Sequence, residues 1–381
     1  MLRATLLLTL FFPTALRASA QEAPQPTITV RQSGEGQWIG NDDEVLQNAL
    51  NQLAKNGGTL VIGAGRYPVR RSLFLPKNVV VRGEEGAVLA LPSPVVTRDA
   101  AAAGSREVVL AEPGEFVGKS RVQILPPVGS EFFADGKTKT LELQQVERVE
   151  KGTLFLIDPL VMDVPAGSRV GYPHKLMQVA KEGLTSIEDL VFEGGRVEAL
   201  PMPGHSQRCA IWSAAPFGFG EQRLGPPGQN VRVRNCLFRD WYGRGVAFYN
   251  QENGLVEGCV FERIADEAID LDHFVQHFRI VGNEVRDAPW GIVLNDASHN
   301  VVEYNRVERC DIGLFMWWYE KTPGPGLNEE NVLRHNVVRG ARQLAIHVAA
   351  TCHKNTIEGN FYEGEIRVDE PDNAVVNNRR L

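Results

Sequence analysis

The chain has 381 residues, of which 43% are hydrophobic and 23% charged, a composition that is typical of globular proteins and excludes a disordered chain. It carries 40 basic and 47 acidic residues, a formal net charge of −7, and no basic cluster is visible that would bind nucleic-acid phosphates. A polyanionic substrate would need local arginines or a metal ion to offset repulsion. The five cysteines are odd in number and lack CxxC spacing, which predicts buried free thiols rather than a disulfide framework.

The first twenty residues have the pattern of a secretory signal peptide. Arg3 precedes an apolar run from Leu6 to Phe12, and Ala18-Ser19-Ala20 is a small-residue cleavage site. This run is too short to span a bilayer, and no later segment has the ~18 apolar residues of a membrane helix. We therefore expect a secreted or periplasmic product that begins near Gln21 and inserts in no membrane. Removal of residues 1–20 takes away two arginines and leaves 38 basic against 47 acidic residues, a net charge of −9.

An amphipathic helix is predicted over residues 42–55, DDEVLQNALNQLAK. Its apolar residues at 45, 46, 49, 50 and 53 have the spacing of one helix face. Asp42 or Asp43 can cap its start, and Gly57-Gly58 can end it. After the helix, short runs of alternating β-branched residues broken by Gly and Pro predict strands at regular intervals.

From residue 230 onward the sequence repeats with a period of about two dozen residues. Each unit contains a first strand and, about ten residues later, a second strand whose apolar residues alternate and should point inward. A solenoid of parallel strands with one coil per unit fits this pattern, whereas leucine-rich and helical repeats need other spacings. In register, one column predicts an internal asparagine ladder in which cysteine is a small substitute; it reads Cys236, Cys259, Asn283, Asn305, Asn336, Asn360 and Asn378.

The helix, the GGTLVIGAGRYPV segment after it and the repeating coils resemble the pectate-lyase-like superfamily over residues 40–92 and 178–381. The resemblance implies an all-β, right-handed parallel β-helix whose N-terminal end is closed by the helix, which would cover an exposed strand edge. Residues 93–177 interrupt the repeat and predict a small antiparallel β insertion that packs on the solenoid or contacts ligand. The expected organisation is a signal peptide over 1–20, the cap helix and first coils over 21–92, the insertion over 93–177 and the remaining coils over 178–381.

The outward positions of the second strands form two columns on one face of the predicted solenoid. Because neighbouring coils are ~4.8 Å apart, Tyr249 and Asn295 should flank Asp272, and Asp270 should share its face. Arg244, Glu267, His273 and Asp296 lie at the ends of the same strands and extend this polar cluster. The first column reads Trp212, Ala247, Asp270, Val293, Phe315, His347, Arg367, and the second reads Ala214, Tyr249, Asp272, Asn295, Trp317, Ala349, Asp369.

Two long loops rich in Gly, Pro and aromatic residues, 213–229 and 317–330, leave the coils on either side of this cluster. Sugars stack on aromatic faces, and function concentrates in loops on a rigid scaffold. This arrangement predicts a groove with an acidic floor, in which Trp317, Trp318 and His347 contact a polysaccharide, with Tyr319 beside them. The alternative for each polar residue is an ordinary solvated strand or turn position.

Three chemistries fit such a floor. In glycoside hydrolysis, Asp270 and Asp272 would act as acid and base. In lyase or epimerase chemistry, Tyr249, His273 or Arg244 would remove the proton beside a uronate carboxylate. Simple glycan binding needs only the aromatic residues and hydrogen bonds.

The other polar residues are assigned to substrate or to a cation. Arg244 would pair with an acidic sugar, and Asn295 and Asp296 would contact its carboxylate or hydroxyl groups. If a cofactor is used, it is Ca²⁺, because this hard cation prefers oxygen ligands. The candidate metal ligands are Glu267, Asp270 and Asp272.

The superfamily's catalytic motifs are not reproduced. Polygalacturonases carry G-H-G and R-x-K, pectate lyases R-x-P-x-x-R and alginate epimerases D-P-H-E; this chain has DEAIDLDH over 266–273 in a similar place. Since a fold does not determine a reaction, the resemblance leaves the activity open. We expect a secreted polysaccharide lyase or glycoside hydrolase, with a non-catalytic glycan-binding or cell-surface β-helix protein as the alternative. The sugar, its linkage and the oligomeric state are not predicted.

Overall fold

The computed structural model describes residues 25–128, 142–202, 208–217, 224–317 and 328–381. The predicted signal peptide, Trp318 and Tyr319 lie outside these residues. No helix in the described ranges combines the length and the apolar character that crossing a membrane requires.

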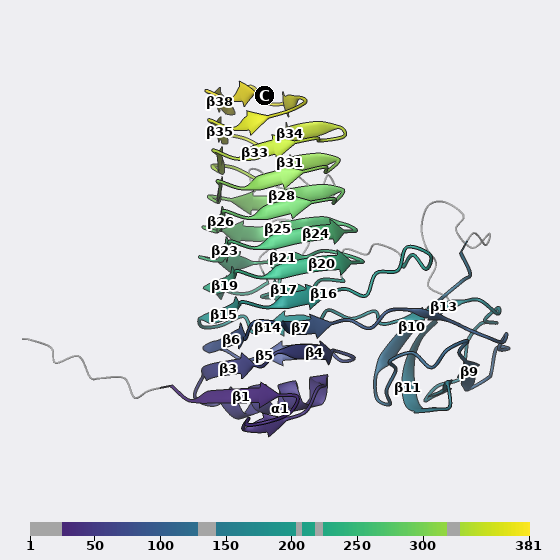
Figure 1. Ribbon diagram of the computed structural model, residues 1–381. Coiled ribbons are helices and arrows are strands. Elements are labelled where there is room, and N and C mark those ends of the chain that lie inside the picture. The colour runs from purple at the N-terminus through teal and green to yellow at the C-terminus, as the bar shows by residue number, and fades with distance from the viewer. Residues whose placement is uncertain (1–24, 129–141, 203–207, 218–223, 318–327) are drawn as a thin grey trace, which may run out of the picture.

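Three long parallel sheets wind around a common core, and every full coil adds one strand to each of them (Figure 1). Sheet A comprises, in spatial order, β2 (Trp38–Ile39), β1 (Thr27–Arg31), β3 (Gly58–Ile62), β6 (Val79–Gly83), β15 (Thr185–Glu188), β19 (Val231–Arg234), β23 (Leu255–Glu257), β26 (Arg279–Val281), β29 (Val301–Glu303), β32 (Val332–Arg334), β35 (Thr356–Glu358) and β38 (Ala374–Val376). Sheet B comprises β4 (Gly65–Pro68), β7 (Ala87–Ala90), β16 (Val191–Glu193), β20 (Leu237–Trp241), β24 (Val260–Ile264), β27 (Glu284–Arg286), β30 (Arg306–Glu308), β33 (Val337–Arg339), β36 (Phe361–Tyr362) and β39 (Arg379–Arg380).

Sheet C carries the predicted site. It comprises β5 (Leu73–Leu75), β14 (Met177–Val179), β17 (Ile211–Ala214), β21 (Val246–Tyr249), β25 (Glu267–Gln276), β28 (Trp290–Ser298), β31 (Ile312–Trp317), β34 (Leu344–Val348) and β37 (Ile366–Val368). The short strand β22 (Gln251–Glu252) pairs with β25 and with β18 (Gly228–Gln229). The sequence repeat predicts two strands per unit, but the structure has three. The missed strand is the one in sheet B, because β19 and β20 are separated only by Asn235-Cys236 and read as one run; Asn235 makes the turn with a φ of 51°.

The helix α1 (Asp43–Leu53) closes the N-terminal end of the coils, as predicted. The side chain of Asp42 accepts hydrogen bonds from the backbone amides of Glu44 and Val45, which is an ordinary N-cap. Gly57 ends the helix with a φ of 73°, which a residue with a side chain adopts only under strain, and its amide donates to the carbonyl of Leu53. The buried face of α1 consists of Leu46, Ala49, Leu50 and Leu53.

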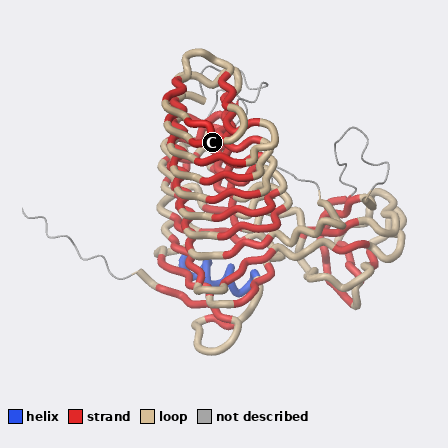
Figure 2. The backbone as a smooth tube through the Cα atoms, turned by 45° about the horizontal axis from the view of Figure 1, so that its top comes forward, coloured by secondary structure: helices blue, strands red, loops and turns tan. Residues whose placement is uncertain are grey.

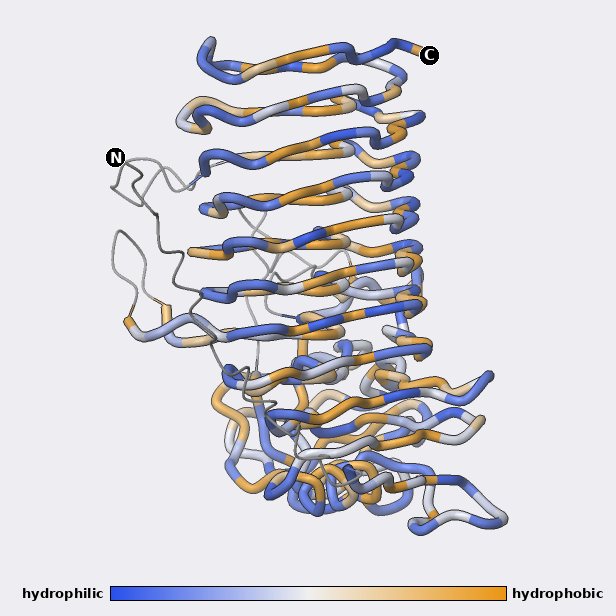
Figure 3. Tube along the Cα trace, turned by 90° about the vertical axis from the view of Figure 1, so that its left-hand side faces the viewer, coloured by the Kyte–Doolittle hydropathy of each residue, from blue (hydrophilic) through white to orange (hydrophobic). Residues whose placement is uncertain are grey.

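Apolar segments recur at the same place in successive coils and meet in one continuous core (Figure 3). The predicted asparagine ladder follows sheet A. Asn305 shows its geometry: Nδ2 donates to the carbonyl of Ile280 and to Oδ1 of Asn336, both at 2.9 Å, while Oδ1 accepts from Asn283. Cys236 and Cys259 continue the same column with buried thiols, as predicted, and the side chains of all five cysteines are buried.

A second asparagine ladder precedes sheet A and was not predicted. Each member donates to the Oδ1 of the next at 3.0–3.1 Å, so a second buried row of amides joins adjacent coils. It could have been recognised, because four successive units begin with asparagine. Its members are Asn300, Asn331, Asn355 and Asn373.

The segment between β7 and β14 forms the predicted antiparallel insertion, which lies at one side of the β-helix (Figures 1 and 2). Its sheet has the order β8 (Val95–Val96), β13 (Arg169–Gly171), β10 (Arg121–Leu125), β11 (Glu142–Glu150), β12 (Thr153–Leu156) and β9 (Glu107–Val109). Arg66 of β4 holds Glu115 of the insertion through two hydrogen bonds of 2.9 and 3.0 Å. Leu125 also packs in a small apolar cluster with Met202 and Tyr242.

Candidate functional site

The register of sheet C confirms the first outward column from Trp212 to Arg367 and the second from Ala214 to Trp317. Ala247 pairs with Asp270, and Asp270 pairs with Val293, in the first column. In the second, Asp272 lies between Tyr249 and Asn295. The partly buried Phe315 and the half-buried His347 continue the first column. Period-two alternation therefore places these side chains on one face, because the apolar members of each strand must enter the core.

We expected β25 and β28 to end after Asp272 and Asn295. Both strands instead continue through an irregularity. The register shifts between Asp272 and Val275, which is a β-bulge. His273 has a φ of 38° and Asp296 a φ of 53°, both in the left-handed region that favours glycine. Non-glycine residues in this region recur in other coils, for example Asn235 and Asp240.

Arg244 is the centre of a buried cluster that we call the Arg244 cluster. Its guanidinium contacts Glu267 at 2.8 and 3.2 Å, Asp270 at 2.6 Å and Asp272 at 3.4 Å. It also donates a short hydrogen bond to the hydroxyl of Tyr249. We expected Arg244 to pair with an acidic sugar, but its charge is already met by three carboxyl groups of the chain. The cluster comprises Arg244, Tyr249, Glu267, Asp270 and Asp272, with His273, Asn295 and Asp296 next to them.

The separation of the two aspartates bears on the reaction. Asp270 and Asp272 contact the same Nη1 atom of Arg244, at 2.6 and 3.4 Å. Their nearest oxygens therefore lie within about 6 Å of each other, less than the roughly 6.5–9.5 Å at which two carboxyl groups flank an attacking water in inverting hydrolysis. Positions i and i+2 of a strand are about 6.6 Å apart, and Arg244 holds the two carboxyl groups together by contacting both.

Asp272 and its neighbours form a second set of contacts. Nδ2 of Asn295 donates to Oδ1 of Asp272 at 3.0 Å. Nδ1 of His273 lies 2.9 Å from Asp296, and its Nε2 lies 3.5 Å from Asp272. His273 thus bridges two carboxylates on adjacent coils, and the predicted residues of the second column come together as one network.

The floor is covered, whereas we expected an open groove wall. Asp270 has 0% of its surface exposed, and Asp272, His273 and Asn295 have 5% each. Phe217 lies over the network: its ring stacks on Tyr249 at 4.7 Å and on His273 at 5.4 Å. Sequence patterns show which way a strand residue points but not which loop lies on it, and for this reason the burial was missed.

Burial raises the pKa of the acids in the Arg244 cluster. For Asp270 the pKa is well above its usual value, chiefly because the group is removed from water, and the charges of Asp272 and Glu267 add to this while Arg244 opposes it. The pKa of Asp272 is also raised by burial, against the charges of His273 and Arg244. Burial, aided by Asp270, raises the pKa of the Tyr249 hydroxyl as well. Each of these groups therefore keeps its proton to a higher pH than the same side chain in water.

His273 shifts in the same direction for a different reason. Burial alone would lower its pKa, but the hydrogen bond to Asp296 and the charge of Asp272 outweigh that effect, and the pKa is raised. The imidazole is therefore more readily protonated than an ordinary histidine.

A calcium ion does not fit the three carboxyl groups considered as its ligands. Glu267, Asp270 and Asp272 all point at the guanidinium of Arg244, which takes the position that a cation would need. In the described ranges, no group of three His, Cys, Asp or Glu side chains has the geometry of a metal site. We derive no step through a metal.

Three buried acceptor oxygens of the site have no hydrogen-bond partner in the described structure. They are Oδ1 of Asp270, Oδ1 of Asn295 and Oδ1 of Asp296. Unsatisfied buried acceptors are costly, and most native proteins contain few of them. These three oxygens could accept hydrogen bonds from donors outside the described chain.

Aromatic side chains line the same face two coils further along, and we call this set the aromatic platform. The rings of Phe315 and Trp317 are nearly parallel, at 5.8 Å, and those of Phe315 and His347 at 5.2 Å. Trp290 lies 6.1 Å from Phe315. These rings are partly exposed. The platform consists of Trp290, Phe315, Trp317 and His347; Trp318, predicted to belong with it, lies outside the described residues.

Some residues of this face were missed. Asp266 directly precedes Glu267, and burial together with Glu267 raises its pKa to about 8. Phe217 carried a usable signal, because it is one of two phenylalanines in the loop already singled out. Trp290 carried none, since it begins its strand before the alternating residues.

The three-sheet coil and the site on sheet C define the class: the chain is a right-handed parallel β-helix protein with a pectate-lyase-like fold. A sequence model of the family described as "Right handed beta helix region" matches residues 226–379. No curated protein sequence matches the chain.

Solved structures share this fold at low sequence identity. DFA-IIIase from Arthrobacter chlorophenolicus A6 in complex with GF2 has 11% identity and a TM-score of 0.53, over 92% of this chain and 79% of its own. XylC in complex with xylose has 9% identity and a TM-score of 0.50, over 93% and 70%. The N-terminal fragment of gene product 12 of bacteriophage Phi29 has 10% identity and a TM-score of 0.50, over 87% and 54%. At these identities the likeness shows the fold alone.

Proposed function

We propose that the chain is an exported carbohydrate-active enzyme that cleaves a polysaccharide at the Arg244 cluster. The observation that carries the proposal is the cluster itself: three carboxyl groups and a tyrosine hydroxyl gathered on one buried arginine, on the outer face of a β-helix sheet. Export is inferred from the signal-peptide pattern of residues 1–20.

Such a cluster is not what the fold needs for stability. Moving several charges out of water costs several kcal/mol per ion, and hydrophobic residues of similar size would often be at least as stable. Groups with strongly shifted pKa values and specific charged partners are instead typical of functional sites. Other coils place Val293 and Phe315 at the position of Asp270, so the scaffold tolerates apolar residues there.

The direction of the pKa shifts favours glycoside hydrolysis over a lyase reaction. Cleavage of a glycosidic bond begins with donation of a proton to the leaving oxygen. Asp270, whose pKa is raised, would be the acid, and Asp272 the second carboxyl group. A lyase needs a deprotonated base, and the raised pKa of Tyr249 keeps that hydroxyl protonated. Arg244 would stabilise the negative charge left on the acid after proton transfer.

The surroundings support a sugar as the ligand. The aromatic platform offers flat rings beside the cluster, and the unpartnered oxygens of Asp270, Asn295 and Asp296 can accept hydrogen bonds from hydroxyl groups. The names of two structures with this fold include a sugar ligand, GF2 or xylose. Asp270 is buried, so a substrate reaches it only if part of its cover moves, and Phe217 covers the neighbouring Tyr249 and His273.

One observation favours a second candidate, a non-catalytic glycan-binding protein. The charge of Arg244 is already met by carboxyl groups of the chain, and the aromatic platform alone can bind a sugar. The two candidates differ in whether the Arg244 cluster takes part in turnover.

The test is a screen of neutral and uronic-acid polysaccharides, followed by reducing ends and by the absorbance of unsaturated uronates. We expect the doubly substituted Asp270→Asn/Asp272→Asn protein to lose at least roughly 100-fold in turnover while its affinity for glycan stays within about tenfold. Asp240→Asn, the same change on sheet B, is the control and should leave turnover unchanged. Glycan binding by the wild type with no cleavage of any polysaccharide would establish the non-catalytic alternative.

A further inference from the structure

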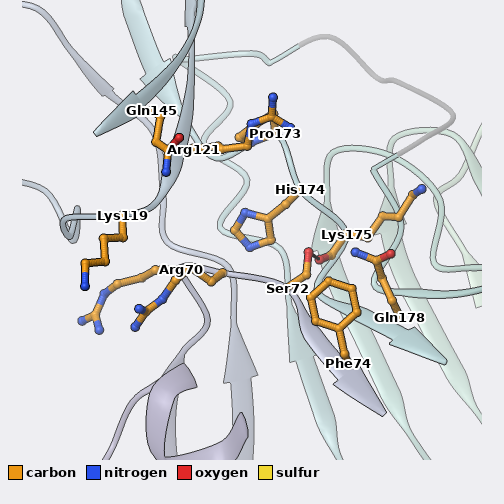
Figure 4. Close-up of a pocket in the computed structure, with 11 residues that line it drawn as sticks. Arg70, Ser72, Phe74, Lys119, Arg121, Gln145, Pro173, His174, Lys175 and Gln178 are labelled. Atoms are coloured by element: carbon orange, nitrogen blue, oxygen red, sulfur yellow. Dashed lines mark hydrogen bonds between the residues drawn. The ribbon is translucent and has the colours of Figure 1, made fainter. Parts of the chain in front are cut away.

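A cationic pocket lies between the insertion and the first coils of the β-helix (Figure 4). It has a volume of about 540 Å³, within the range of pockets that hold small molecules. Its walls come from the turn before β5, from β10 and β11, and from residues 173–178. None of the residues lining it is acidic, and five are cations: Arg70, Arg71, Lys119, Arg121 and Lys175.

No basic cluster is visible in the sequence, but the folded chain gathers one at this pocket. Only Arg70 and Arg71 are adjacent in sequence, and Lys119, Arg121 and Lys175 reach the pocket from the insertion and from the chain after it. The fold therefore assembles a local positive surface on a protein of net charge −7.

Within the described residues, most of these cations have no carboxylate partner. Arg71 pairs with Asp43 at 2.6 Å and with Glu44 at 3.4 Å. For the other four, no carboxylate of the described chain lies within ion-pair distance. Arg70 donates to the backbone carbonyl of Glu115, and the ammonium of Lys175 lies 3.5 Å above the ring of Trp212. Cations collected without anions repel one another, and an anionic ligand removes that cost.

The remaining lining suits a saccharide. Phe74 leaves 58% of its surface exposed and turns toward the pocket, where a sugar ring can stack on it (Figure 4). Gln145 and Gln178 add amide donors and acceptors. The planar guanidinium group of arginine can donate two parallel hydrogen bonds to the oxygens of a carboxylate or sulfate group.

His174 adds an uncharged contact. Burial lowers its pKa to about 4, so the imidazole is neutral at neutral pH. Its Nε2 lies 3.2 Å from the carbonyl of Val69 and must donate to it, which leaves Nδ1 as an acceptor.

The pocket belongs to the same face of the β-helix as the Arg244 cluster. Phe74 pairs with Gln178, Gln178 with Trp212, and Trp212 with Ala247, which is next to Asp270. Four strand spacings separate Phe74 from Asp270, or about 19 Å. One extended polymer that runs along sheet C would meet the cationic pocket, the Arg244 cluster and the aromatic platform in turn.

We propose that the cationic pocket binds carboxylate or sulfate groups of an anionic polysaccharide and holds that polymer along sheet C. The statement that this polymer is the substrate rests on the proposed function; binding at the pocket does not. The pocket supplies the local arginines that a polyanion needs in order to approach an acidic protein.

The test measures binding by calorimetry with three probes of equal length: oligogalacturonate, a sulfated dextran oligosaccharide and unmodified dextran. We expect the wild type to bind at least one anionic probe more tightly than dextran. Lys119→Gln/Arg121→Gln should weaken that binding by roughly tenfold or more. The carboxylate and sulfate probes distinguish the two sources of negative charge. All measurements are repeated with Asp270→Asn/Asp272→Asn, which should bind as the wild type does.

The matched control is Arg98→Gln/Lys151→Gln, which removes the same two charges from exposed positions of the insertion outside the pocket. Equal losses in the control and the pocket variant would show a general charge effect and overturn the proposal, as would no preference for either anionic probe. Retained binding without turnover would remove the proposed function and leave the pocket. Turnover of a neutral polysaccharide by a protein that binds neither anionic probe would overturn the proposal for the pocket and leave the proposed function.

Discussion

Asp266 shows how a single carboxyl group at the edge of the Arg244 cluster couples protonation to stability. Its pKa is raised from 3.8 to about 8, first by burial and then by the neighbouring charge of Glu267. Because the folded-state pKa is above the unfolded one, the stabilisation from this group is fully present below about pH 4 and is lost as the pH rises through 8. At alkaline pH the carboxylate of Asp266 is deprotonated, and its partly buried negative charge destabilises the folded state.

We expect Asp266→Asn, which resembles the neutral acid, to be more stable than the wild type at pH 9 by about 1–3 kcal/mol and nearly equal to it at pH 4. Urea unfolding at pH 4, 6.5 and 9 measures this. Asp287→Asn is the control of opposite sign, because the ion pair with Arg309 lowers the pKa of Asp287 and its small contribution is present only above the unfolded value. A stability difference for Asp266→Asn that does not change with pH would contradict the argument.

For single residues, the sequence predicted the direction in which side chains point but not the groups that they contact. Tyr249, Asp272 and Asn295 were placed side by side because strand alternation leaves only two faces. The collection of three carboxyl groups on Arg244 could not be predicted, since it depends on the path of a long side chain across coils. Nor could the cover over the site, which Phe217 provides from a loop.

The repeating element of the fold is one coil, and the buried side-chain amides of asparagines join one coil to the next. These polar side chains enter the core at the turns of the coil. In the first ladder, Asn305 satisfies two backbone groups of the preceding coil and donates to the asparagine of the following one. The sequence showed this ladder because its spacing is regular. The sheet B strands were missed because a two-residue turn leaves no loop between them and sheet A.

Asn305→Ala should lower the free energy of unfolding by roughly 3–5 kcal/mol, because it leaves the amide of Asn283 and the carbonyl of Ile280 buried without partners. The matched control is Asn378→Ala at the last coil, where the side chain is only partly buried and water can replace its bonds. We expect that control to cost about 1 kcal/mol. Thermal or urea unfolding distinguishes the two, and equal losses would mean that ladder position does not matter.

For the whole molecule, the sequence predicted the solenoid and its insertion but not the surface between them. The solenoid could be predicted from local periodicity, because every unit repeats the same pattern of strands and turns. The cationic pocket depends on how the insertion lies against the first coils, and that contact joins Arg70, Lys119 and Lys175 from segments far apart in the chain. No local pattern specifies such a surface.

The two ends of the solenoid differ, and hydrogen exchange should show it. At the N-terminal end, α1 covers the core with Leu46, Leu50 and other apolar side chains. In the last described coil, Val375 and Leu381 expose 50% and 52% of their surface, and β37, β38 and β39 each pair on one side only. In a solenoid each coil is stabilised by its neighbours, so the terminal coil opens most easily.

We therefore expect backbone amides in 361–381 to exchange at least about tenfold faster than those of β25 and β28, while β3, which is next to α1, is protected like the central coils. Exchange followed by mass spectrometry of peptides measures this at two protein concentrations. Protection of 361–381 equal to that of the central coils would refute a free end. If that protection fell on dilution, a second copy of the chain would be the cover, because association depends on concentration whereas packing within one chain does not.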